Sequence, residues 1–578
     1  MTISSRGSQE RRNAMVEYLK QMSEIVQDSG DYEQSSHALA AILTEIKGKE
    51  TLIATDQKLS KVLEKLIESS GTTVEVLKAL FERLTPIIHD IAYDQYGSHV
   101  IETLIRALGN VELDFELRNR VSSFTDALLS DMYSLLSDRR ATFIIRTAII
   151  TFGGLKLAEG DMIEQLKKAA PSEGMLFESG FKRILESVES LEGLASEPHS
   201  SVSIQILLIA GSKCSPGSLN KLLSIIFKNE DGSIACDRIK SALNNPIESK
   251  LLEVAASCLS DDLRRQLINE LIDPNTVLFS VDGGDDVREG GSKSFLDSRF
   301  AFGFLQSFIG GLCSVDLAAD FIDRVLSPEG MKLLVERGRI HGIGVLQKMA
   351  DLLIGLIQPQ TKFFDNLCKA LRADKENIWM VILSLSFTGQ CTSSAIDEPR
   401  ITPQGCLLMS TLLQFKVSSV QAIVSHSKSI VEHLSSLDLL NSRFLNDIGP
   451  GRMLQTLISK ESCFPSNMRA KIIRNVLLTE NSSDRLGKLA SDKRVGAWLI
   501  TTAWDGADLT TKKALGESLL NVTGLRDSNW KIWKHCELAS FSRRQEEWSH
   551  SETRKDKAKD FLRDIVGDDF RPNKKPKA

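Results

Sequence analysis

The chain of 578 residues has few cysteines, and their placement excludes two common uses of the thiol group. Its nine cysteines are scattered from Cys214 to Cys536, and no two form a Cys-x-x-Cys pair. This spacing offers neither a zinc site nor a disulfide framework. Reduced thiols in the core of an intracellular protein are therefore expected.

Long apolar runs and targeting segments are missing as well. The richest apolar run, Trp379 to Phe387, is much shorter than the roughly 18 residues that a membrane-spanning helix needs. Residues 1–30 are polar and charged, so no signal peptide is expected. We therefore expect no association with a membrane.

Catalytic motifs are absent too. The chain contains no His-Glu-x-x-His, phosphate-binding loop or Gly-x-Ser-x-Gly. Asp282, Asp285 and Asp286 lie in an acidic, glycine-rich stretch, but the spacing and terminal Glu of a calcium loop are missing. We expect no catalytic residue, no metal and no cofactor.

Composition indicates a helical protein without a strong charge of either sign. There are only 14 prolines and strand signals are scarce, so the chain is expected to be nearly all helical. The net charge is −5 and the isoelectric point about 6.1. This balance argues against coating nucleic acid by charge alone, but it allows a few bases to be bound along one face.

The most informative stretch is Asp94 to Ile105. Its apolar residues fall on one helical face, at Val100, Ile101, Leu104, Ile105 and Leu108. Ser98 and Glu102 are four residues apart and share a different face, with His99 beside them. The pattern predicts a helix that buries one side and exposes a short polar, an aromatic and an acidic side chain.

This layout returns along the chain, which indicates a solenoid of repeats. Its first displayed residues are Ser98, Thr142, Ser201, Ser249, Phe302, Ile343, Asn377, Cys406, Gly451, Gly496 and Asn529. Their spacing is irregular, so several repeats are expected to carry insertions. We assign a charged helical lead-in to residues 1–50 and the array to 51–548, with loop insertions near 282–293 and 388–402.

Residues 549–578 are expected to form a charged tail with a basic end, Arg571 to Ala578. Such a cluster suits nuclear targeting or nucleic-acid contact, and a solvated end fits the same composition.

Tyr96 to Glu102 resembles the second helix of a Pumilio (PUF) repeat. The irregular spacing and the segment Asn529 to Leu538 resemble the nucleolar protein nine family, a divergent Pumilio group. The resemblance implies an all-α fold, an α-solenoid of about ten to eleven Pumilio-like three-helix repeats in a C-shaped array. Each repeat of such an array contacts roughly one RNA base.

The resemblance also implies a function. Members of that family are nucleolar factors of small-subunit ribosome biogenesis. They bind single-stranded or structured precursor ribosomal RNA and restrain premature cleavage near the 3′ end of the small-subunit RNA. A monomer located in the nucleus and nucleolus, among pre-ribosomal particle proteins, is expected.

Carried over position by position, the resemblance assigns RNA contacts to individual residues. Ser98 and Glu102 would bond a base edge, with a preference for guanine, while His99 stacks between bases. Arg146 departs from the usual Gln or Glu, and Val202 stacks poorly. The other expected contacts are Thr142, Phe143, Ser201, Gln205, Ser249, Lys250, Glu253, Gly451, Arg452, Gln455, Asn529 and Trp530.

Two other functions stay open at this stage. The acidic isoelectric point and the degenerate repeats also suit a HEAT- or armadillo-like protein scaffold. A cytoplasmic Pumilio-type messenger-RNA regulator would have the same repeats in another compartment.

Overall fold

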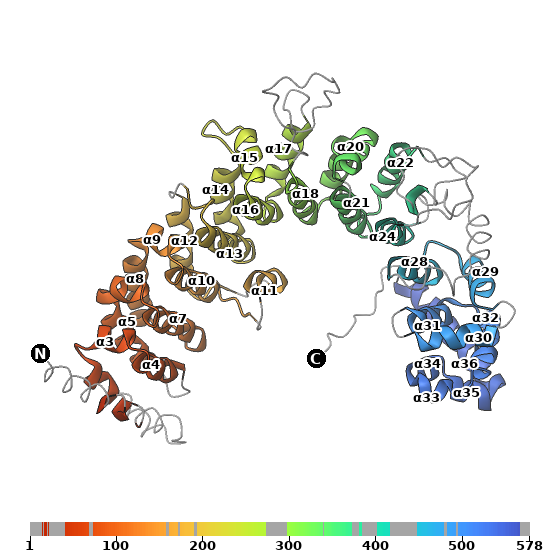
Figure 1. The fold of residues 1–578 in the computed structure, drawn as a ribbon, viewed down its shortest axis with the longest axis horizontal. Coiled ribbons are helices and arrows are strands. Elements are labelled where there is room, and N and C mark those ends of the chain that lie inside the picture. Colours follow the sequence, from red (N-terminus) through yellow and green to blue (C-terminus); the bar gives the residue numbers. More distant parts are fainter. Residues whose placement is uncertain are drawn as a thin grey trace, which may run out of the picture. The chain divides into compact units, whose positions relative to one another are not determined.

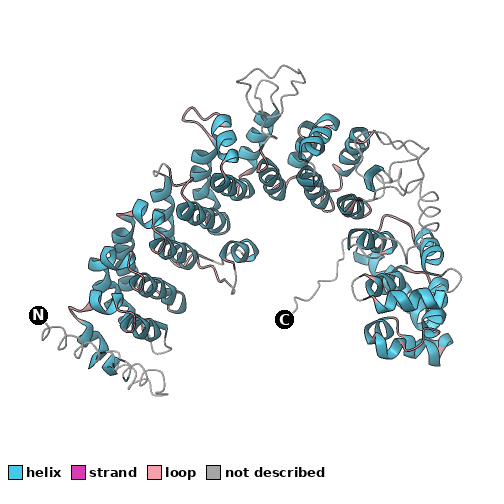
Figure 2. Cartoon of the chain, viewed as in Figure 1, coloured by secondary structure: helices cyan, strands magenta, loops and turns pink. Residues whose placement is uncertain are grey.

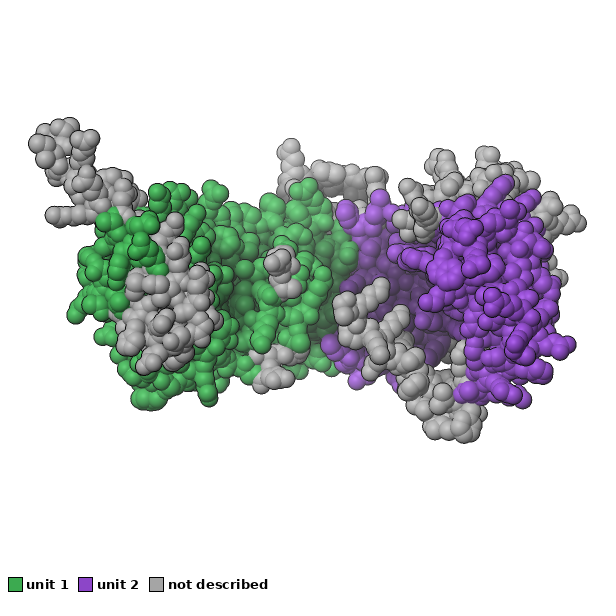
Figure 3. Space-filling view, turned by 90° about the horizontal axis from the view of Figure 1, so that it is seen from below, with its two compact units in different colours: residues 1–311 green, residues 312–578 purple. Residues whose placement is uncertain are grey.

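A computed structural model describes most of the chain. The described residues are 14–15, 17–19, 21, 41–68, 73–157, 161–170, 174–189, 193–272, 298–338, 340–372, 381–383, 402–416, 448–478, 482–492 and 495–566. Two compact units, Met1–Gly311 and Leu312–Ala578, are coloured separately in Figure 3. Each unit is described by itself.

Helices account for nearly all regular structure in both units (Figure 2). Unit 1 contains α3 (Glu50–Thr55), α4 (Leu59–Glu68), α5 (Val74–Leu84), α6 (Ile88–Ala92), α7 (Gly97–Ala107), α8 (Phe115–Leu129), α9 (Met132–Ser137), α10 (Ala141–Phe152), α11 (Met162–Lys168), α12 (Glu178–Glu189), α13 (Pro198–Cys214), α14 (Pro216–Phe227), α15 (Cys236–Asn244), α16 (Pro246–Ser257), α17 (Asp261–Ile272) and α18 (Ala301–Gly310), with short 3-10 turns at Thr85–Ile87 and Leu108–Asn110. Outside these helices, the described residues of unit 1 include one isolated antiparallel bridge between Lys228 and Ile234.

Unit 2 has the same helical character. It contains α19 (Val315–Arg324), α20 (Pro328–Gly338), α21 (Ile340–Leu353), α22 (Gln360–Ala370), α24 (Pro403–Leu412), α28 (Ile448–Ile458), α29 (Ser466–Leu477), α30 (Ser482–Ser491), α31 (Gly496–Gly506), α32 (Leu509–Leu520), α33 (Leu525–Ser528), α34 (Trp530–His535), α35 (Leu538–Arg543) and α36 (Gln545–Val566). The all-α solenoid that the sequence predicted is confirmed.

Consecutive repeats stack through one helix each, which we call the second-helix row. In unit 1 this row is α4, α7, α10, α13, α16 and α18, each packed on the next (Figure 1). In unit 2 it is α21, α24, α28, α31 and α34, again in sequential contact. Residues of the second-helix row that belong to different repeats therefore lie on neighbouring helices.

Capping residues explain where the helices of this row begin. The Asp94 carboxylate accepts bonds from the amides of Tyr96 (2.8 Å) and Gly97 (2.9 Å), just ahead of α7. Asp138 does the same ahead of α10, and Asn245 ahead of α16. These side chains satisfy amides that have no partner inside the helix, so each cap fixes the first turn.

A second set of helices, α5, α8, α12 and α14, forms the opposite layer of unit 1, in which each helix packs on the next. Phe81 of α5 and Phe124 of α8 meet edge to face, with ring centroids 5.0 Å apart, in the buried core. Arg183 of α12 is paired with Asp126 of α8. Aromatic contacts and ion pairs between neighbouring repeats thus hold this layer together.

The end of unit 2 differs from the tail that the sequence suggested. The expected boundary at residue 548 falls inside α36, and Trp548 packs edge to face on Phe541, with ring centroids 4.9 Å apart. Four residues later, the Glu552 carboxylate forms a buried ion pair with Lys512 of α32. The charged composition of this segment did not indicate these apolar and ionic contacts. Because of them, the first half of α36 packs as part of the array.

Several expected segments lie outside the described residues. They are most of the lead-in at 1–50, the insertion near 282–293, 388–401 of the second insertion, the repeat position Asn377, and the basic end Arg571 to Ala578. Thr402 caps α24 by accepting a bond from the amide of Gly405 (3.0 Å). Among the described residues, no helix is long and apolar enough for a bilayer, and no group of three or more His, Cys, Asp or Glu could hold a metal.

Candidate nucleic-acid interface

A recurring backbone bond sets the register of the second-helix row. The amide of Ser98 donates to the carbonyl of Asp94, four residues earlier, at 3.2 Å. We call the donating residue the first position of its helix, the next residue the second position, and the residue four after the first the fifth position. The same bond defines first positions at Ser60, Thr142, Ser201, Ser249, Cys406 and Trp533.

The first-position side chains of α4, α7, α10, α13 and α16 are buried, which corrects the expectation that they are exposed. Ser98 is only 3% exposed, and its counterparts in α4, α10, α13 and α16 are buried at least as deeply. The Thr142 hydroxyl lies 2.7 Å from that of Ser203 on α13, and the Ser249 hydroxyl donates to the carbonyl of Pro246 at 3.2 Å. Small residues stand here because neighbouring helices of the row approach closely.

In α7 and α16 the second- and fifth-position side chains reach the surface together. The His99 side chain is 61% exposed, and its Nδ1 lies 3.4 Å from Oε1 of Glu102, which is 15% exposed. In α16, Lys250 Nζ lies 2.8 Å from Oε2 of Glu253. Each of these helices therefore displays an exposed ring or cation beside a half-buried carboxylate that can accept hydrogen bonds.

The carboxylates of α4 and α7 share one electrostatic environment. Burial raises the pKa of the Glu102 carboxyl group, while the charges of His99 and Arg106 oppose this rise. Burial likewise raises the pKa of Glu64, and the same two side chains again act in the opposite direction. The Thr147 hydroxyl of α10 donates a hydrogen bond to Glu102. Two acceptor groups are thus held close to positive charge on adjacent helices.

A hollow of about 440 Å³ lies between α7 and α10. From α7 it is lined by Ser98, His99 and Glu102, together with Gln95, and from α10 by Phe143 with Asp138, Arg139 and Arg140. Phe143 is 43% exposed. Two rings and two arginines around a polar floor are the groups that stack on bases and attract phosphates.

Arg146, at the fifth position of α10, uses its guanidinium to bind other residues of the protein. Its Nε donates to the Ser203 hydroxyl at 3.0 Å, and its Nη2 donates to the carbonyl of His199 at 3.1 Å. The guanidinium also lies 4.6 Å from the ring centre of Phe143. Arg146 is 8% exposed and joins α10 to α13, so we assign it a supporting role beneath the Phe143 ring.

Two further triplets make contacts inside the protein. Gln205 of α13 is buried and donates to the Ser201 hydroxyl at 3.4 Å, while Val202 is half-buried. In α16, the Glu253 carboxylate extends toward α18, because a Cβ placed on Gly303 would lie 2.3 Å from its Oε1. A glycine stands at Gly303 because a larger residue would collide with Glu253, which explains why the repeat of α18 has no displayed side chain at this position.

Unit 2 repeats one contact of unit 1. In unit 1 the fifth-position Glu102 pairs with Thr147, which stands five residues after the first position of the next helix. Gln347 and Thr411 form the same contact at 2.7 Å, and Gln455 and Thr502 at 3.0 Å. This places Gly451 at a first position, where it is buried, and Arg452 at a second position, where it is exposed.

The contact with Thr502 shows that the sequence placed α31 one residue too early. Gly496 is equivalent to Gly97, because a Cβ at either glycine would lie within 2.4 Å of a carbonyl oxygen in the preceding helix. Ala497 is therefore the first position, and its amide donates to the carbonyl of Asp492 at 3.3 Å. One additional residue after the cap caused the shift, which makes Trp498 the second position.

The last repeat is shifted by four residues. Asn529 is the capping residue of α34, since its side chain accepts from the amide of Ile532 at 3.2 Å and donates to the carbonyl of Ala490 at 2.9 Å. Trp533 is the first position and Lys534 the second. Asn529 was mistaken for a displayed residue because Asn suits either role. Trp530 is nevertheless 55% exposed.

One triplet was missed in the sequence. Ser60, Lys61 and Glu64 of α4 hold the first, second and fifth positions, buried, exposed and half-buried in turn. Asp56 caps this helix by accepting from the amides of Lys58 (2.8 Å) and Leu59 (3.2 Å). The sequence signal is an acidic residue, a serine four residues later, and a glutamate four residues after the serine. Asp94, Ser98 and Glu102 have the same spacing.

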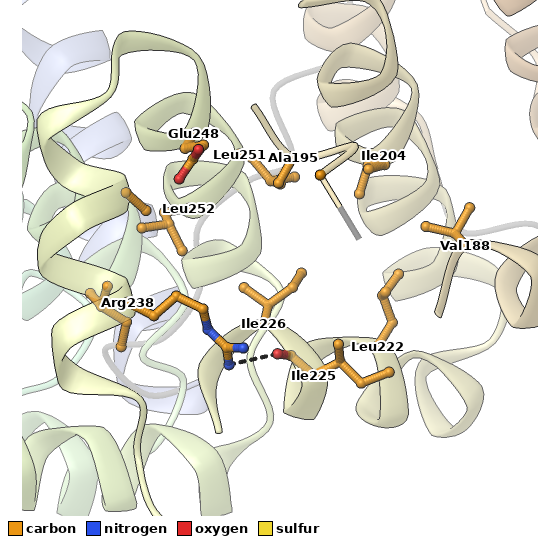
Figure 4. A pocket seen from close by; sticks show the side chains of 13 residues that line it. Val188, Ala195, Ile204, Leu222, Ile225, Ile226, Arg238, Glu248, Leu251 and Leu252 are labelled. Atoms are coloured by element: carbon orange, nitrogen blue, oxygen red, sulfur yellow. Dashed lines mark hydrogen bonds between the residues drawn. The ribbon is translucent and has the colours of Figure 1, made fainter. Parts of the chain in front are cut away.

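A separate hollow of about 380 Å³ lies among α12 to α16 and is mainly aliphatic (Figure 4). Leu222, Ile226 and Leu252 are among its lining residues. The Arg238 guanidinium at its edge donates to the carbonyls of Ile225 (2.7 Å) and Lys228 (2.6 Å). Its chemistry is unlike that of the polar hollow between α7 and α10, so it is not part of the candidate interface.

The chain is similar to a set of named proteins. Nucleolar protein 9 of Ajellomyces dermatitidis is 22% identical over 576 residues, which cover 89% of this chain and 79% of that protein. Nucleolar protein 9 of Lodderomyces elongisporus is 36% identical over 83 residues, 14% of this chain and 11% of that protein. The solved structure of APUM23-GGAGUUGACGG has a TM-score of 0.67 at 16% identity and covers 93% of this chain and 98% of that chain.

A family model decides the assignment. The model of the NOP9-like PUF repeat domain matches residues 48–529, which is well over half of the chain. The match agrees with the stacked second helices and with the recurring first, second and fifth positions. This chain belongs to the family of NOP9-like PUF repeat proteins.

Proposed function

We propose that this protein binds precursor ribosomal RNA in the nucleolus during maturation of the small ribosomal subunit. We further propose that it acts as a monomer and restrains premature cleavage near the 3′ end of the small-subunit RNA. The observation that carries the proposal is the repeated pairing of an exposed ring or cation with a carboxylate that can accept hydrogen bonds, on α4, α7 and α16 of the second-helix row. Bound RNA would follow this row, with its bases toward the helices.

Side-chain chemistry supports a preference for particular bases. Glu64, Glu102 and Glu253 occupy fifth positions, and an ionised carboxylate can only accept hydrogen bonds. Guanine offers two adjacent donors on its Watson–Crick edge, and adenine does not. We therefore propose that α4, α7 and α16 each favour guanine. The cations beside these carboxylates reduce their repulsion of phosphate.

Similarity supports the setting of this activity. The relatives are named Nucleolar protein 9, which supports a nucleolar location. The APUM23 structure carries the sequence GGAGUUGACGG, in which uracil indicates RNA. Because the repeats belong to a PUF family, a HEAT- or armadillo-type scaffold is disfavoured.

Binding is tested by titrating the protein with labelled single-stranded fragments of precursor ribosomal RNA at moderate salt. Wild type should bind in the micromolar range or tighter. His99→Ala should weaken binding by about 1–3 kcal/mol, because it removes one stacking surface. Tyr133→Ala is a matched control, since Tyr133 is an exposed aromatic residue on α9, outside the second-helix row. Absence of RNA binding by the wild type would overturn the proposal.

The cleavage role needs its own experiment. Precursor RNA from cells depleted of this protein should show early cleavage near the 3′ end of the small-subunit RNA. Wild-type protein should restore normal timing, and a folded variant that does not bind RNA should not. A tagged protein that is found in the cytoplasm would instead favour a messenger-RNA regulator.

A further inference from the structure

Two tryptophans of unit 2 are unusually exposed. Trp498 on α31 is 62% exposed and Trp530 on α34 is 55% exposed. By contrast, Trp504 and Trp548 are buried against each other, with ring centroids 5.7 Å apart. Large indole rings left in water are unfavourable, and such rings are enriched where a protein meets a ligand or partner.

The register of the second-helix row places both tryptophans at one junction. α31 and α34 pack on each other, as α7 and α10 do. Trp498 follows the first position Ala497, so it is equivalent to His99. Trp530 stands three residues before the first position Trp533, as Arg139 stands three before Thr142. His99 and Arg139 both line the hollow between α7 and α10.

The cations of the junction follow the same equivalence. Lys531 corresponds to Arg140, and Lys534 corresponds to Phe143 at the second position. Both lysines are exposed. The junction of α7 with α10 and the junction of α31 with α34 therefore each have two rings and two cations at four equivalent positions. At two of these positions, a ring in one junction corresponds to a cation in the other. The RNA-type chemistry of the first junction is preserved although the residues differ.

Two acidic groups near this junction are paired within the protein. Asp505 of α31 lies 3.1 Å from Nε2 of His535 on α34. Glu537, in the turn between α34 and α35, is paired with Lys555 of α36 at 2.9 Å. Arg452, at the second position of the neighbouring helix α28, is exposed. Among the described residues near the junction, two indoles and three cations are exposed to a ligand, a combination that suits single-stranded RNA.

We infer that Trp498 and Trp530 form a second RNA contact, at which unpaired nucleotides stack without regard to base identity. The inference rests on the proposed function. Ala497 offers no polar group at the first position, and the Thr501 hydroxyl at the fifth position already donates to the carbonyl of Trp498 at 3.0 Å. Stacking by indole rings tolerates every base, because each base has a π face. This junction adds affinity, whereas the carboxylates of unit 1 select guanine.

The test compares Trp498→Ala, Trp530→Ala and the double variant in the full chain. The probes are the precursor ribosomal RNA fragment that wild type binds and an oligouridine of equal length. Loss of one stacked base should weaken binding about five- to 150-fold. The loss should be similar for both probes, since stacking does not depend on sequence. Trp498→Phe keeps a ring and should retain most of the affinity.

Controls separate failure of this inference from failure of the proposed function. Circular dichroism and urea unfolding should match wild type, because both tryptophans are exposed. If His99→Ala weakens RNA binding but the double tryptophan variant does not, the second contact is refuted and the proposed function stands. If wild type binds neither probe, the proposed function itself fails. Photo-crosslinking of RNA to residues 495–535 should be lost in the double variant, and crosslinks that persist there would contradict the assignment.

Discussion

Replacing Arg146 by methionine distinguishes a supporting residue from one that binds RNA directly. Methionine keeps an apolar stem of similar length but removes the guanidinium. The variant loses the bonds to the Ser203 hydroxyl (3.0 Å) and to the His199 carbonyl (3.1 Å), both on α13. It also loses the contact with the Phe143 ring. All three interactions occur at a site that is 8% exposed.

The expected cost follows from these contacts. A hydrogen bond to a charged group contributes about 1.5–3 kcal/mol, and a desolvated cation–π contact roughly 0.5–2 kcal/mol. Burial of the charge offsets part of this sum, as the lowered pKa of Arg146 indicates. We expect Arg146→Met to destabilise the contact between α10 and α13 by about 3 kcal/mol, taking the lower value for each bond.

Hydrogen exchange measures the loss of stability separately for each helix. A local measurement is needed because a solenoid unfolds in parts. Amides of α10 and α13 should lose protection, while amides of α31 should not change. Ser203→Ala provides a partial control, since it removes one of the two bonds. Unchanged protection together with a large loss of RNA affinity would refute the supporting role and make Arg146 a direct ligand group.

Two further predictions concern unit 2. Glu552→Gln should destabilise α36 by about 3–5 kcal/mol, because Lys512 is left buried without its partner, while Lys512→Met with Glu552→Leu should recover most of the loss. Protease cleavage after α35 reports on this, and a wild-type rate in the single variant would contradict it. The hydrogen bond that His535 donates to the Asp505 carboxylate raises the pKa of His535. The pair therefore stabilises the fold below the ordinary pKa of about 6.5 and loses this effect as pH rises through the raised value. Asp505→Asn should therefore reduce exchange protection of α34 at about pH 5.5, by up to roughly 1 kcal/mol, and have little effect at about pH 8.5; equal effects at both values would refute the assignment.

The sequence predicted the repeats well where helix periodicity and capping agree. Asp94 and Asp138 each stand four residues before a small buried residue, and the apolar residues that follow are regularly spaced. These local features are decided by the backbone and the helix face, so they can be recognised without tertiary information. The order of helices in the second-helix row follows from them.

The exposure of individual side chains and the register of some helices were predicted less well than the repeats themselves. Ser98 is buried because neighbouring helices approach closely, a tertiary effect that polarity does not reveal. Arg146 is a long cation that suits either RNA or a partner helix, and only the positions of Ser203 and His199 decide between them. The extra residue between Asp492 and Ala497 moves the first position of α31 by one residue, while the spacing of its apolar residues stays the same. Trp498 consequently became recognisable as a second-position residue only from the contact between Gln455 and Thr502.

The central claim is that successive helices present base-binding groups, and Glu102 tests it most directly. The measurement is a competition series in which the four bases are varied at the RNA position covered by α7, for wild type and for Glu102→Gln. Wild type should prefer guanine there, and the variant should lose roughly 1–3 kcal/mol of this discrimination, the scale of one bidentate contact to a base. Overall affinity should hold or rise, since a negative charge is removed. A wild type without a guanine preference at that position, or a variant that keeps the full preference, would contradict the account.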